Sequence, residues 1–459
     1  MDTNGEPTPS EDEQGLDPVM LADLADAVDE RDRPWLSRTL ARLHPADAAD
    51  ALEQLSLDAF CEAVELLGGQ LPSEILIELR DAYREVAVEA LPDAVVAEAL
   101  DVLDSDDATT ILEDLEDERR EKILAEIAPR ERAALEQGFS YGEETAGRLM
   151  QTEVVAAPEF WTVGEAIDHA REQGERLPAQ FYEICVVDPG MKVRGVVPLS
   201  MLMRTARDET LADIMQPLES DIRGDMDQEE VAYQFQKYHL AQAPVKDADG
   251  RLIGIITVDD MVDVIQDENT EDLLALSNVS SSEGSGTVIS SVRARAPWLA
   301  VNLVTAFFIS GVIAVFEATI EQIVALAILM PVVAALGGNA GSQGLAVSVR
   351  AISERQLEGS AASRAVLREC LTGLVNGVIF AIGVGAIAYV WFRDVELALV
   401  IAAAMLATFF WAGLSGVLVP LGLKRLGADP AVASSVFVLT LTDIVAFLSF
   451  LGLATLVLL

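Results

Sequence analysis

Nearly all of the net charge of this chain precedes Arg293, and all of its membrane-length apolar runs follow that residue. From Arg293 onward there are nine basic and nine acidic residues, against 22 basic and 66 acidic residues before it, so the formal net charge of −44 belongs to the first 292 residues. About 20 apolar residues cross a ~30 Å hydrocarbon core. The chain is therefore predicted to join an acidic soluble region to a membrane domain. Because acidic surfaces repel phosphates, nucleic acid is not an expected partner.

The apolar half is predicted to span the membrane five times, with lipid as its surroundings. Eight of its nine basic residues fall in loops on the side of the soluble region, and only Arg393 falls on the other side. The positive-inside rule then places the N-terminus in the cytoplasm and Leu459 outside, in a multi-pass protein of the cell (inner) membrane. The expected spans are residues 297–316, 320–349, 365–392, 397–421 and 432–459.

Asp443 is the carboxylate that lies well inside a predicted span, within Thr440-Leu441-Thr442-Asp443. A charged side chain there costs roughly 2.5–3.5 kcal/mol on insertion scales. One interpretation is a buried acid that bonds to neighbouring hydroxyl groups. The other, which we favour, is a cation ligand that faces a hydrated pathway, with Thr440 beside it.

The second predicted span contains Pro331 and then a glycine-rich stretch at residues 337–344. These residues predict a break in the helix, and broken backbone at membrane depth is tolerated where protein or a cavity covers it. The freed carbonyl of Gly338 and the amides of Asn339 and Gln343 would then line the pathway. Helix packing explains the same glycines equally well, because small residues four apart let two helices approach closely. Gly373 and Gly377 in the third span are expected to serve packing alone.

The soluble region begins with an acidic segment, residues 1–20, that is expected to be disordered. Residues 21–140 show apolar positions at helical spacing throughout. Prolines at positions 45, 72, 92 and 129 mark helix starts. This region is predicted to form a short superhelix of paired helices.

Residues 145–207 and 208–263 form an internal repeat. Cys185-Val186-Val187-Asp188 followed by a glycine-led strand recurs 59 residues later as Pro244-Val245-Lys246-Asp247. Each copy predicts strand, helix, strand, turn, strand and helix, with the first helices at 163–173 and 228–238. Two copies this small are expected to pack against each other.

Carboxylates gather at the end of the second copy and along the connecting segment, residues 264–292. Like charges at three- and four-residue spacing destabilise a helix unless something neutralises them. Mg²⁺ keeps most of its waters and takes one or two carboxylates, so paired acids suit it. A solvated acidic face is the alternative. The predicted regulatory metal ligands are Asp225, Asp227, Asp259, Asp260, Asp263, Asp267, Glu268 and Glu271.

The repeat resembles a tandem pair of CBS modules, which commonly bind adenosyl nucleotides. Gly254, Thr257 and Asp260 match the sequence motif that contacts ribose and phosphate in such modules, whereas the first copy lacks the Thr and the Asp. The resemblance implies one site for ATP, with Arg204, Arg207 or Lys246 able to face its phosphates. The alternative is a strand-to-helix turn, in which a Thr or an Asp caps the helix.

The complete chain resembles the MgtE family of magnesium transporters, on the order of its domains together with Pro331-Val332-Val333, Gly337-Gly338-Asn339 and Thr440-Leu441-Thr442-Asp443. The resemblance implies a multi-domain fold: an all-α superhelical N domain, an α/β tandem CBS pair, a connecting (plug) helix and a five-helix transmembrane domain over 293–459. It also implies a homodimer with a shared pore, a hydrated Mg²⁺ held at Asp443, closure by cytoplasmic Mg²⁺ and tuning by ATP. No enzymatic activity is expected.

Two other functions fit parts of the pattern. One is a transporter or exporter of another divalent ion such as Co²⁺. The other is a nucleotide-sensing membrane scaffold that does not conduct. The scaffold needs neither Asp443 nor a broken second span, so these two features argue against it.

Overall fold

The computed structural model describes residues 18–113, 115–174, 177–178, 180–276, 288–357 and 359–459. The chain divides into two compact units, residues 1–265 and 266–459, which are considered separately below. Most of the segment expected to be disordered, and residues 277–287 of the connecting segment, lie outside the described residues.

The first unit opens with the predicted helical region. Pro45 and Pro129 occupy the first positions of their helices, and Pro72 and Pro92 are the residues just before theirs, as expected. Most of these helices pack chiefly against the second helix along the chain rather than the next one, around one apolar core that extends from Leu24 to Leu135. The elements are α1 (Pro18–Asp29), α2 (Arg33–Leu40), α3 (Pro45–Glu53), α4 (Leu57–Leu67), η1 (Gly68–Gln70), α5 (Ser73–Glu78), α6 (Asp81–Ala90), α7 (Asp93–Leu100), α8 (Ser105–Glu113), α9 (Asp117–Glu126) and α10 (Pro129–Phe139).

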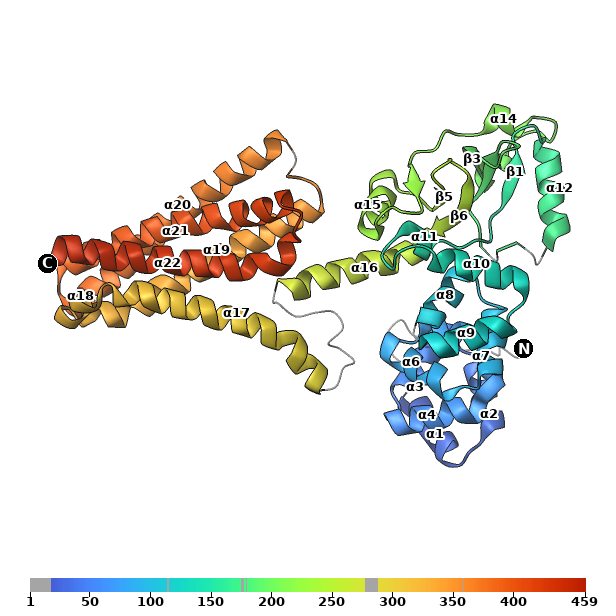
Figure 1. Cartoon of the computed structure of the whole chain (residues 1–459), viewed down its shortest axis with the longest axis horizontal. Helices are drawn as coiled ribbons and strands as arrows, with labels where there is room; N and C mark the ends of the chain where they lie inside the picture. The colour runs from blue at the N-terminus through green and yellow to red at the C-terminus, as the bar shows by residue number, and fades with distance from the viewer. Residues whose placement is uncertain (1–17, 114, 175–176, 179, 277–287, 358) are drawn as a thin grey trace, which may run out of the picture. The chain divides into compact units, whose positions relative to one another are not determined.

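The internal repeat has the predicted order of elements in both copies (Figure 1). In each three-stranded sheet the first pair of strands is parallel and the second pair is antiparallel. The first copy contains α11 (Ala146–Leu149), β1 (Ala156–Pro158), α12 (Val163–Gln173), β2 (Glu183–Val187), β3 (Val193–Pro198) and α13 (Leu199–Leu202). The second contains α14 (Leu211–Ile214), β4 (Ile222–Arg223), α15 (Gln228–Tyr238), β5 (Gln242–Lys246), β6 (Leu252–Thr257) and the start of α16 (Val258–Ala275).

The two copies interlock through reciprocal backbone pairing. Gln151, ahead of the first sheet, pairs with Ile255 of β6, and Gln216 pairs in the same way with Val196 of β3. A Cβ atom on Gly254 would lie 2.7 Å from the Gln151 carbonyl oxygen. Glycine is therefore required there for the two segments of the chain to approach this closely. The prediction that the copies pack against each other is confirmed.

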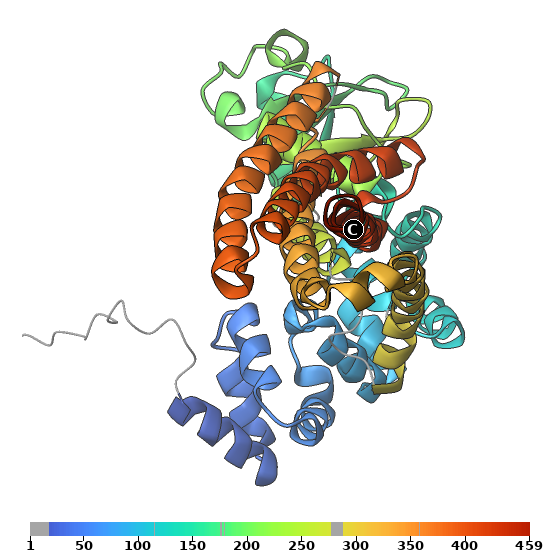
Figure 2. The same cartoon turned by 90° about the vertical axis from the view of Figure 1, so that its left-hand side faces the viewer.

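The second unit contains five helices long and apolar enough to cross a membrane, as predicted. They are α17 (Val288–Ala314), α19 (Ala325–Ser353), α20 (Ser360–Phe392), α21 (Val395–Arg425) and α22 (Pro430–Leu458), with the short α18 (Glu317–Gln322) between the first two. Ile320 belongs to α18, so the second span begins five residues later than predicted. Within this unit α21 packs against α19, α20 and α22, and α17 contacts chiefly α22 (Figure 1, Figure 2).

Glycines allow the closest approach between these helices. A Cβ on Gly373 of α20 would lie 2.4 Å from the Phe409 carbonyl oxygen, and a Cβ on Gly413 of α21 would lie 2.4 Å from that of Glu369. Gly377 faces Phe409 in the same contact. The packing role predicted for Gly373 and Gly377 is confirmed.

The predicted break in the second span is wrong, because α19 is a continuous helix with Pro331 inside it. Its glycines instead allow α21 and α22 to pack closely against it. A Cβ on Gly337 would lie 2.4 Å from Thr408 Cγ2 of α21, and a Cβ on Gly341 would lie 3.0 Å from Val438 Cγ1 of α22. Close packing keeps the helix regular through a sequence that would weaken it in isolation.

Candidate functional site: an ion pathway and its acidic sensor

One face of α19 is polar and exposed within a membrane span. Asn339, Ser342 and Gln343 are exposed, whereas Gly337 and Gly341 on the other face are buried against neighbouring helices. Polar side chains at membrane depth face a hydrated cavity or another protein surface, because lipid cannot satisfy their hydrogen bonds. This stripe therefore marks a surface of the unit that does not face lipid.

Asp443 of α22 is partly buried and has no hydrogen bond or ion pair with any residue that the structure describes. The neighbouring hydroxyl groups are already engaged: Thr440 Oγ1 donates to the Val436 carbonyl at 2.6 Å, and Thr442 Oγ1 donates to the Val438 carbonyl at 2.9 Å. The alternative of an acid held by nearby hydroxyls is therefore not what the structure shows. A carboxylate at this depth requires water, a cation or another chain.

The helices that carry the predicted pore residues lie against each other. A Cβ on Gly338 would lie 3.4 Å from Leu439 Cδ2, and one on Gly341 would lie 3.1 Å from Thr442 Cγ2. Gly338 is buried in this contact, and in an unbroken helix its carbonyl is not freed for an ion, which corrects its predicted role. Asn339 and Gln343 have no hydrogen bond to Asp443 among the described residues.

In the first unit, acidic residues at the start of α8 lie close to the start of α16. Burial raises the pKa of Asp107 to about 7, and the nearby charge of Asp260 adds to this shift. Burial also raises the pKa of Asp260 to about 6, against a lowering by its bond from Thr257. The pKa of Asp106 is raised well above its usual value by burial and by Asp260, and that of Asp104 by burial and by Glu153. These carboxylates therefore lack a positive charge that would compensate their desolvation.

A hydrogen-bonded latch fixes this arrangement. Glu153, in the segment before β1, accepts from Ser105 Oγ at 2.8 Å and from the Ser105 N–H at 3.2 Å, and Ser105 Oγ accepts from the Thr152 N–H at 2.8 Å. The latch binds the first turn of α8 to the repeat. It thereby positions Asp106 and Asp107 beside α16.

The sequence did not nominate Asp104, Asp106, Asp107 or Glu153. Acidic residues are common in the first turn of a helix because the helix dipole stabilises them there. The local sequence therefore does not indicate that α8 lies close to α16. Within the described residues, no group of three or more His, Cys, Asp or Glu is arranged as a ready-made metal chelate. Asp106 and Asp107 of α8 and Asp260 of α16 are the residues that could bind a Mg²⁺ ion that retains most of its waters.

The other predicted sensor residues differ in their surroundings. Asp225 accepts two bonds from Arg223, at 3.0 and 2.8 Å, and Asp227 caps α15 by accepting from the Glu229 N–H at 2.9 Å. Both carboxylates thus have structural partners. Burial and the charge of Asp259 raise the pKa of Asp263. The remaining predicted acids lie along α16 as expected, with Asp259, Asp263, Asp267 and Glu271 exposed and Glu268 partly buried.

The far end of α16 belongs to the second unit and packs there on α19 and α22. Ala275 is buried against Leu345 and Val438. Asp272 accepts from Ser353 Oγ at 2.8 Å, and its pKa is raised by burial and by the charge of Asp429, the residue that caps α22. Asp429 was not recognised from the sequence, because its role as a helix cap explains its position.

The residues predicted to bind nucleotide also have structural partners. Thr257 Oγ1 donates to Asp260 Oδ2 at 2.6 Å, which is a helix-capping contact, and Gly254 is required by the crossing chain described above. Arg207 pairs with Asp168 and Lys246 pairs with Asp221, both at 2.5 Å, while Arg204 donates to the Ser200 carbonyl. These contacts are those of a strand-to-helix turn, and a bound nucleotide would have to replace some of them.

Three family models match the chain. The divalent cation transporter model of MgtE matches residues 330–453, the MgtE intracellular N domain model matches residues 43–144, and the CBS domain model matches residues 211–267. Together they match most of the helical region, the second copy of the repeat and the membrane unit from within α19 to within α22.

Curated relatives agree with these matches. The magnesium transporter MgtE of Thermus thermophilus is 35% identical over 335 residues, which are 72% of this chain and 74% of the relative. That of Enterococcus faecalis is 34% identical over 325 residues, 71% of this chain and 72% of the relative. A crystal structure of the cytosolic domain of the Mg²⁺ channel MgtE in complex with ATP is 32% identical and covers 53% of this chain and 99% of that one, with a TM-score of 0.49. The predicted resemblance and fold class are confirmed: this chain belongs to the MgtE family of magnesium transporters, which are membrane transport proteins and not enzymes.

Proposed function

We propose that this chain passes Mg²⁺ through a pore formed by two copies of its membrane unit, with Asp443 as the ligand of the ion. The observation that carries this proposal is the Asp443 carboxylate, which has no protein partner in the described chain although Thr440 and Thr442 stand beside it. A two-fold axis next to α22 would bring two such carboxylates to one hydrated ion, and two charges compensate one Mg²⁺.

The exposed stripe of α19 supports the same arrangement. Asn339, Ser342 and Gln343 need water or protein, and a water-filled path beside a second copy supplies both. A hydrated Mg²⁺ would meet side-chain amides that bind its waters, while Asp443 supplies the charge. In this proposal the soluble region is cytoplasmic, Leu459 lies outside, and the pore crosses the cell membrane.

We further propose that cytoplasmic Mg²⁺ closes the pore through the acidic residues of the first unit and of α16. Asp106 and Asp107 on α8 and Asp260 on α16 repel one another when ionised, and a bridging Mg²⁺ removes that repulsion. Asp272 and Asp429 offer a comparable pair where α16 meets α22. Moving a gate from 1:99 to 99:1 requires about 5.5 kcal/mol of differential binding, so several such sites must act together.

ATP is proposed as a modulator that binds the second copy of the repeat. The sequence motif formed by Gly254, Thr257 and Asp260 supports this proposal. The ribose of ATP would have to compete with the bond between Thr257 and Asp260. Asp260 also belongs to the proposed Mg²⁺ sensor, so ATP and Mg²⁺ must alter each other's affinity by the same factor. Calorimetry on the full-length protein with ATP, with and without Mg²⁺, tests this proposal, which no heat in either condition would exclude.

Mg²⁺ uptake into proteoliposomes tests the pore. Asp443→Asn keeps the shape of the side chain and removes its charge, and it is expected to reduce flux roughly 100-fold, because losing one partner of a desolvated charge pair costs about 2–5 kcal/mol. Glu317→Gln, which neutralises an exposed acid at the start of α18, serves as the control and should keep wild-type flux. Wild-type flux in the Asp443→Asn protein would remove Asp443 from the pathway. Comparing Mg²⁺ with Co²⁺ and Ca²⁺ in the same assay defines the selectivity.

A further inference from the structure

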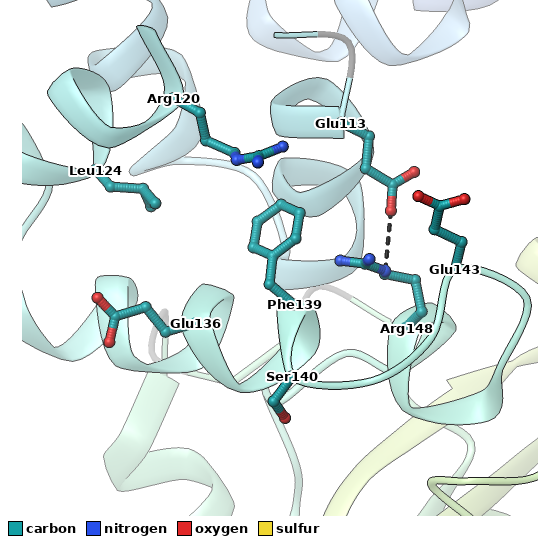
Figure 3. A pocket seen from close by; sticks show the side chains of 8 residues that line it. All are labelled: Glu113, Arg120, Leu124, Glu136, Phe139, Ser140, Glu143 and Arg148. Carbon is teal, nitrogen blue, oxygen red and sulfur yellow. Dashed lines mark ion pairs between the residues drawn. The ribbon is translucent and has the colours of Figure 1, made fainter. Parts of the chain in front are cut away.

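A cavity of about 650 Å³ lies where the N-terminal helices lead into the repeat (Figure 3). Its walls come from α9 and α10 on one side and from Glu143 and α11 on the other. A molecule bound here would contact both sides of the joint between these parts of the first unit. None of the residues proposed above for transport or sensing lines this cavity.

Two guanidinium groups approach one aromatic ring in the cavity. The Arg148 guanidinium carbon lies 4.6 Å from the centre of the Phe139 ring, and that of Arg120 lies 5.2 Å from it. Figure 3 shows the two side chains reaching Phe139 from different elements. Arg120 also pairs with Asp117, so its charge is already balanced outside the cavity.

Arg148 has hydrogen-bond donors that the protein does not use. Its side chain is 11% exposed, and Glu113 Oε1 lies 3.1 Å from its Nε as an ion pair. Nε and Nη1 are nevertheless buried without a hydrogen-bond acceptor among the described residues. A buried guanidinium with open donors favours an oxyanion, above all a carboxylate that can accept two parallel bonds.

Carboxylates in the same cavity limit what can bind. Glu136 and Glu143 line it, and neither forms an ion pair in the described ranges of the chain. In a chain of net charge −44 they disfavour a ligand that is only anionic. A ligand with an ammonium group next to its carboxylate satisfies Arg148 and an acid together. Glu143 and Arg148 both line this cavity, as Figure 3 shows.

We propose that this cavity binds a small zwitterion, an α-amino acid, with its carboxylate on Arg148, its ammonium on Glu143 and its side chain against Phe139 and Leu124. Bound there, it bridges α9 and α10 to α11 and stiffens the joint. A cavity of this size has ample room for such a ligand.

Calorimetry on the full-length protein in detergent tests the proposal with glycine, leucine and phenylalanine, which share both charges and differ in side chain. At least one is expected to bind, and leucine more tightly than glycine. Leucinamide lacks the carboxylate and N-acetylleucine lacks the ammonium, and each should bind at least about tenfold more weakly than leucine, because each loses one charge-assisted contact. No binding by any of the three amino acids, or equal binding of leucine and either analogue, overturns the proposal.

Two variants assign the contacts. Arg148→Gln is expected to weaken leucine binding at least about tenfold, and so is Glu143→Gln, which alters an exposed side chain and leaves the core intact. Glu121→Gln, an exposed change on α9 outside the cavity, is the matched control and should bind like the wild type. If Glu143→Gln binds leucine like the control, the ammonium contact and with it the zwitterion are excluded.

Discussion

The two units of this protein handle charge in opposite ways. The membrane unit has one carboxylate well inside its spans, Asp443, and no described residue pairs with it. The first unit brings carboxylates from α8, α16 and the segment before β1 into one neighbourhood, where burial raises the pKa values of Asp106, Asp107 and Asp260. An unpaired, partly buried carboxylate such as Asp443 suits brief binding of a permeating ion. A group of mutually repelling carboxylates suits a regulatory ion whose binding changes the conformation.

The two units also differ in how their elements pack together. Helices α20 and α21 meet backbone to backbone at Gly373 and Gly413, in a contact with no room for a side chain. The junction of α8 with the repeat instead depends on the hydrogen bonds between Ser105, Thr152 and Glu153. The membrane contact is a permanent part of the fold, whereas the proposed gating requires the polar junction to open and close.

The largest expected effect is on this permanent contact. Gly413→Leu places side-chain atoms where the Glu369 carbonyl oxygen lies 2.4 Å from the Cβ position, so α20 and α21 must separate. Overpacking of this kind costs about 1–3 kcal/mol or more. The yield of folded protein after detergent extraction, measured by size-exclusion chromatography and thermal unfolding, is expected to fall severely.

Gly383→Leu is the matched control, since nothing lies within 4 Å of its Cβ position on the same helix as Gly373. It adds the same side chain to a membrane-spanning glycine without a clash, so near-normal yield and unfolding temperature are expected. Equal losses in both variants would show that these helices do not meet as closely as the glycine contact requires.

The next effect concerns the junction of α8 with α16 in the absence of Mg²⁺. Burial raises the pKa of Asp107 from 3.8 to about 7 and that of Asp260 to about 6, so the closed junction binds more protons than a solvent-exposed one between about pH 4 and pH 7. Stability of the docked state is therefore fully present below about pH 4, falls as pH rises from about 4 to about 7, and is regained as pH falls. Protease protection of the soluble region in Mg²⁺-free buffer should be greater at pH 6 than at pH 8.

Asp106→Asn combined with Asp107→Asn removes two of the groups responsible for this dependence. The protection of this double variant is expected to be high at both pH values and to respond less to added Mg²⁺. Glu116→Gln combined with Asp117→Asn, at exposed positions by the start of α9, is the control and should keep the wild-type dependence. Protection that rises with pH in the wild type would contradict the proposed sensor.

Local periodicity predicted the elements well but could not predict contacts between distant segments. Helices 163–173 and 228–238 were predicted with the bounds of α12 and α15, because each copy of the repeat carries clear turn signals. Pro331 and the glycines after it predicted a break because their helix propensity is low. The structure has a continuous α19, since Thr408 and Val438 on other helices fill the space beside those glycines. Tertiary packing overrides propensity here.

The candidate sites show the same limit. Asp443 was found from its depth in an apolar run, which is a property of the sequence alone. Asp106, Asp107 and Glu153 were missed because they become a site only when α8 meets the segment before β1, some 47 residues away in the chain. Asp225 was nominated by charge, although Arg223 two residues earlier is its partner.

A smaller effect is expected from the exposed stripe of α19. Asn339→Leu keeps the side chain close in size and removes an amide proposed to bind the waters of the ion. One lost water-mediated or direct hydrogen bond is worth about 1 kcal/mol, so Mg²⁺ flux should fall roughly fivefold. Val332→Leu, an exposed apolar position on the same helix, should leave flux unchanged. An Asn339→Leu protein with wild-type flux would place the ion path elsewhere than along this face.

The smallest effect is expected at Asp225, which charge alone had grouped with the sensor. Its carboxylate holds Arg223 through two bonds at 3.0 and 2.8 Å, and both side chains are more than half exposed. Exposed ion pairs contribute about 0.2–1 kcal/mol, so Asp225→Asn should change the Mg²⁺ concentration for half-maximal protease protection by less than about fivefold. Asp260→Asn is the comparison within the same unit, because its buried carboxylate lies in the field of α8, and it should shift that concentration more. If Asp225→Asn shifts it as far as Asp260→Asn does, Asp225 exchanges Arg223 for the ion, and the contrast between crowded and paired carboxylates no longer identifies the sensor.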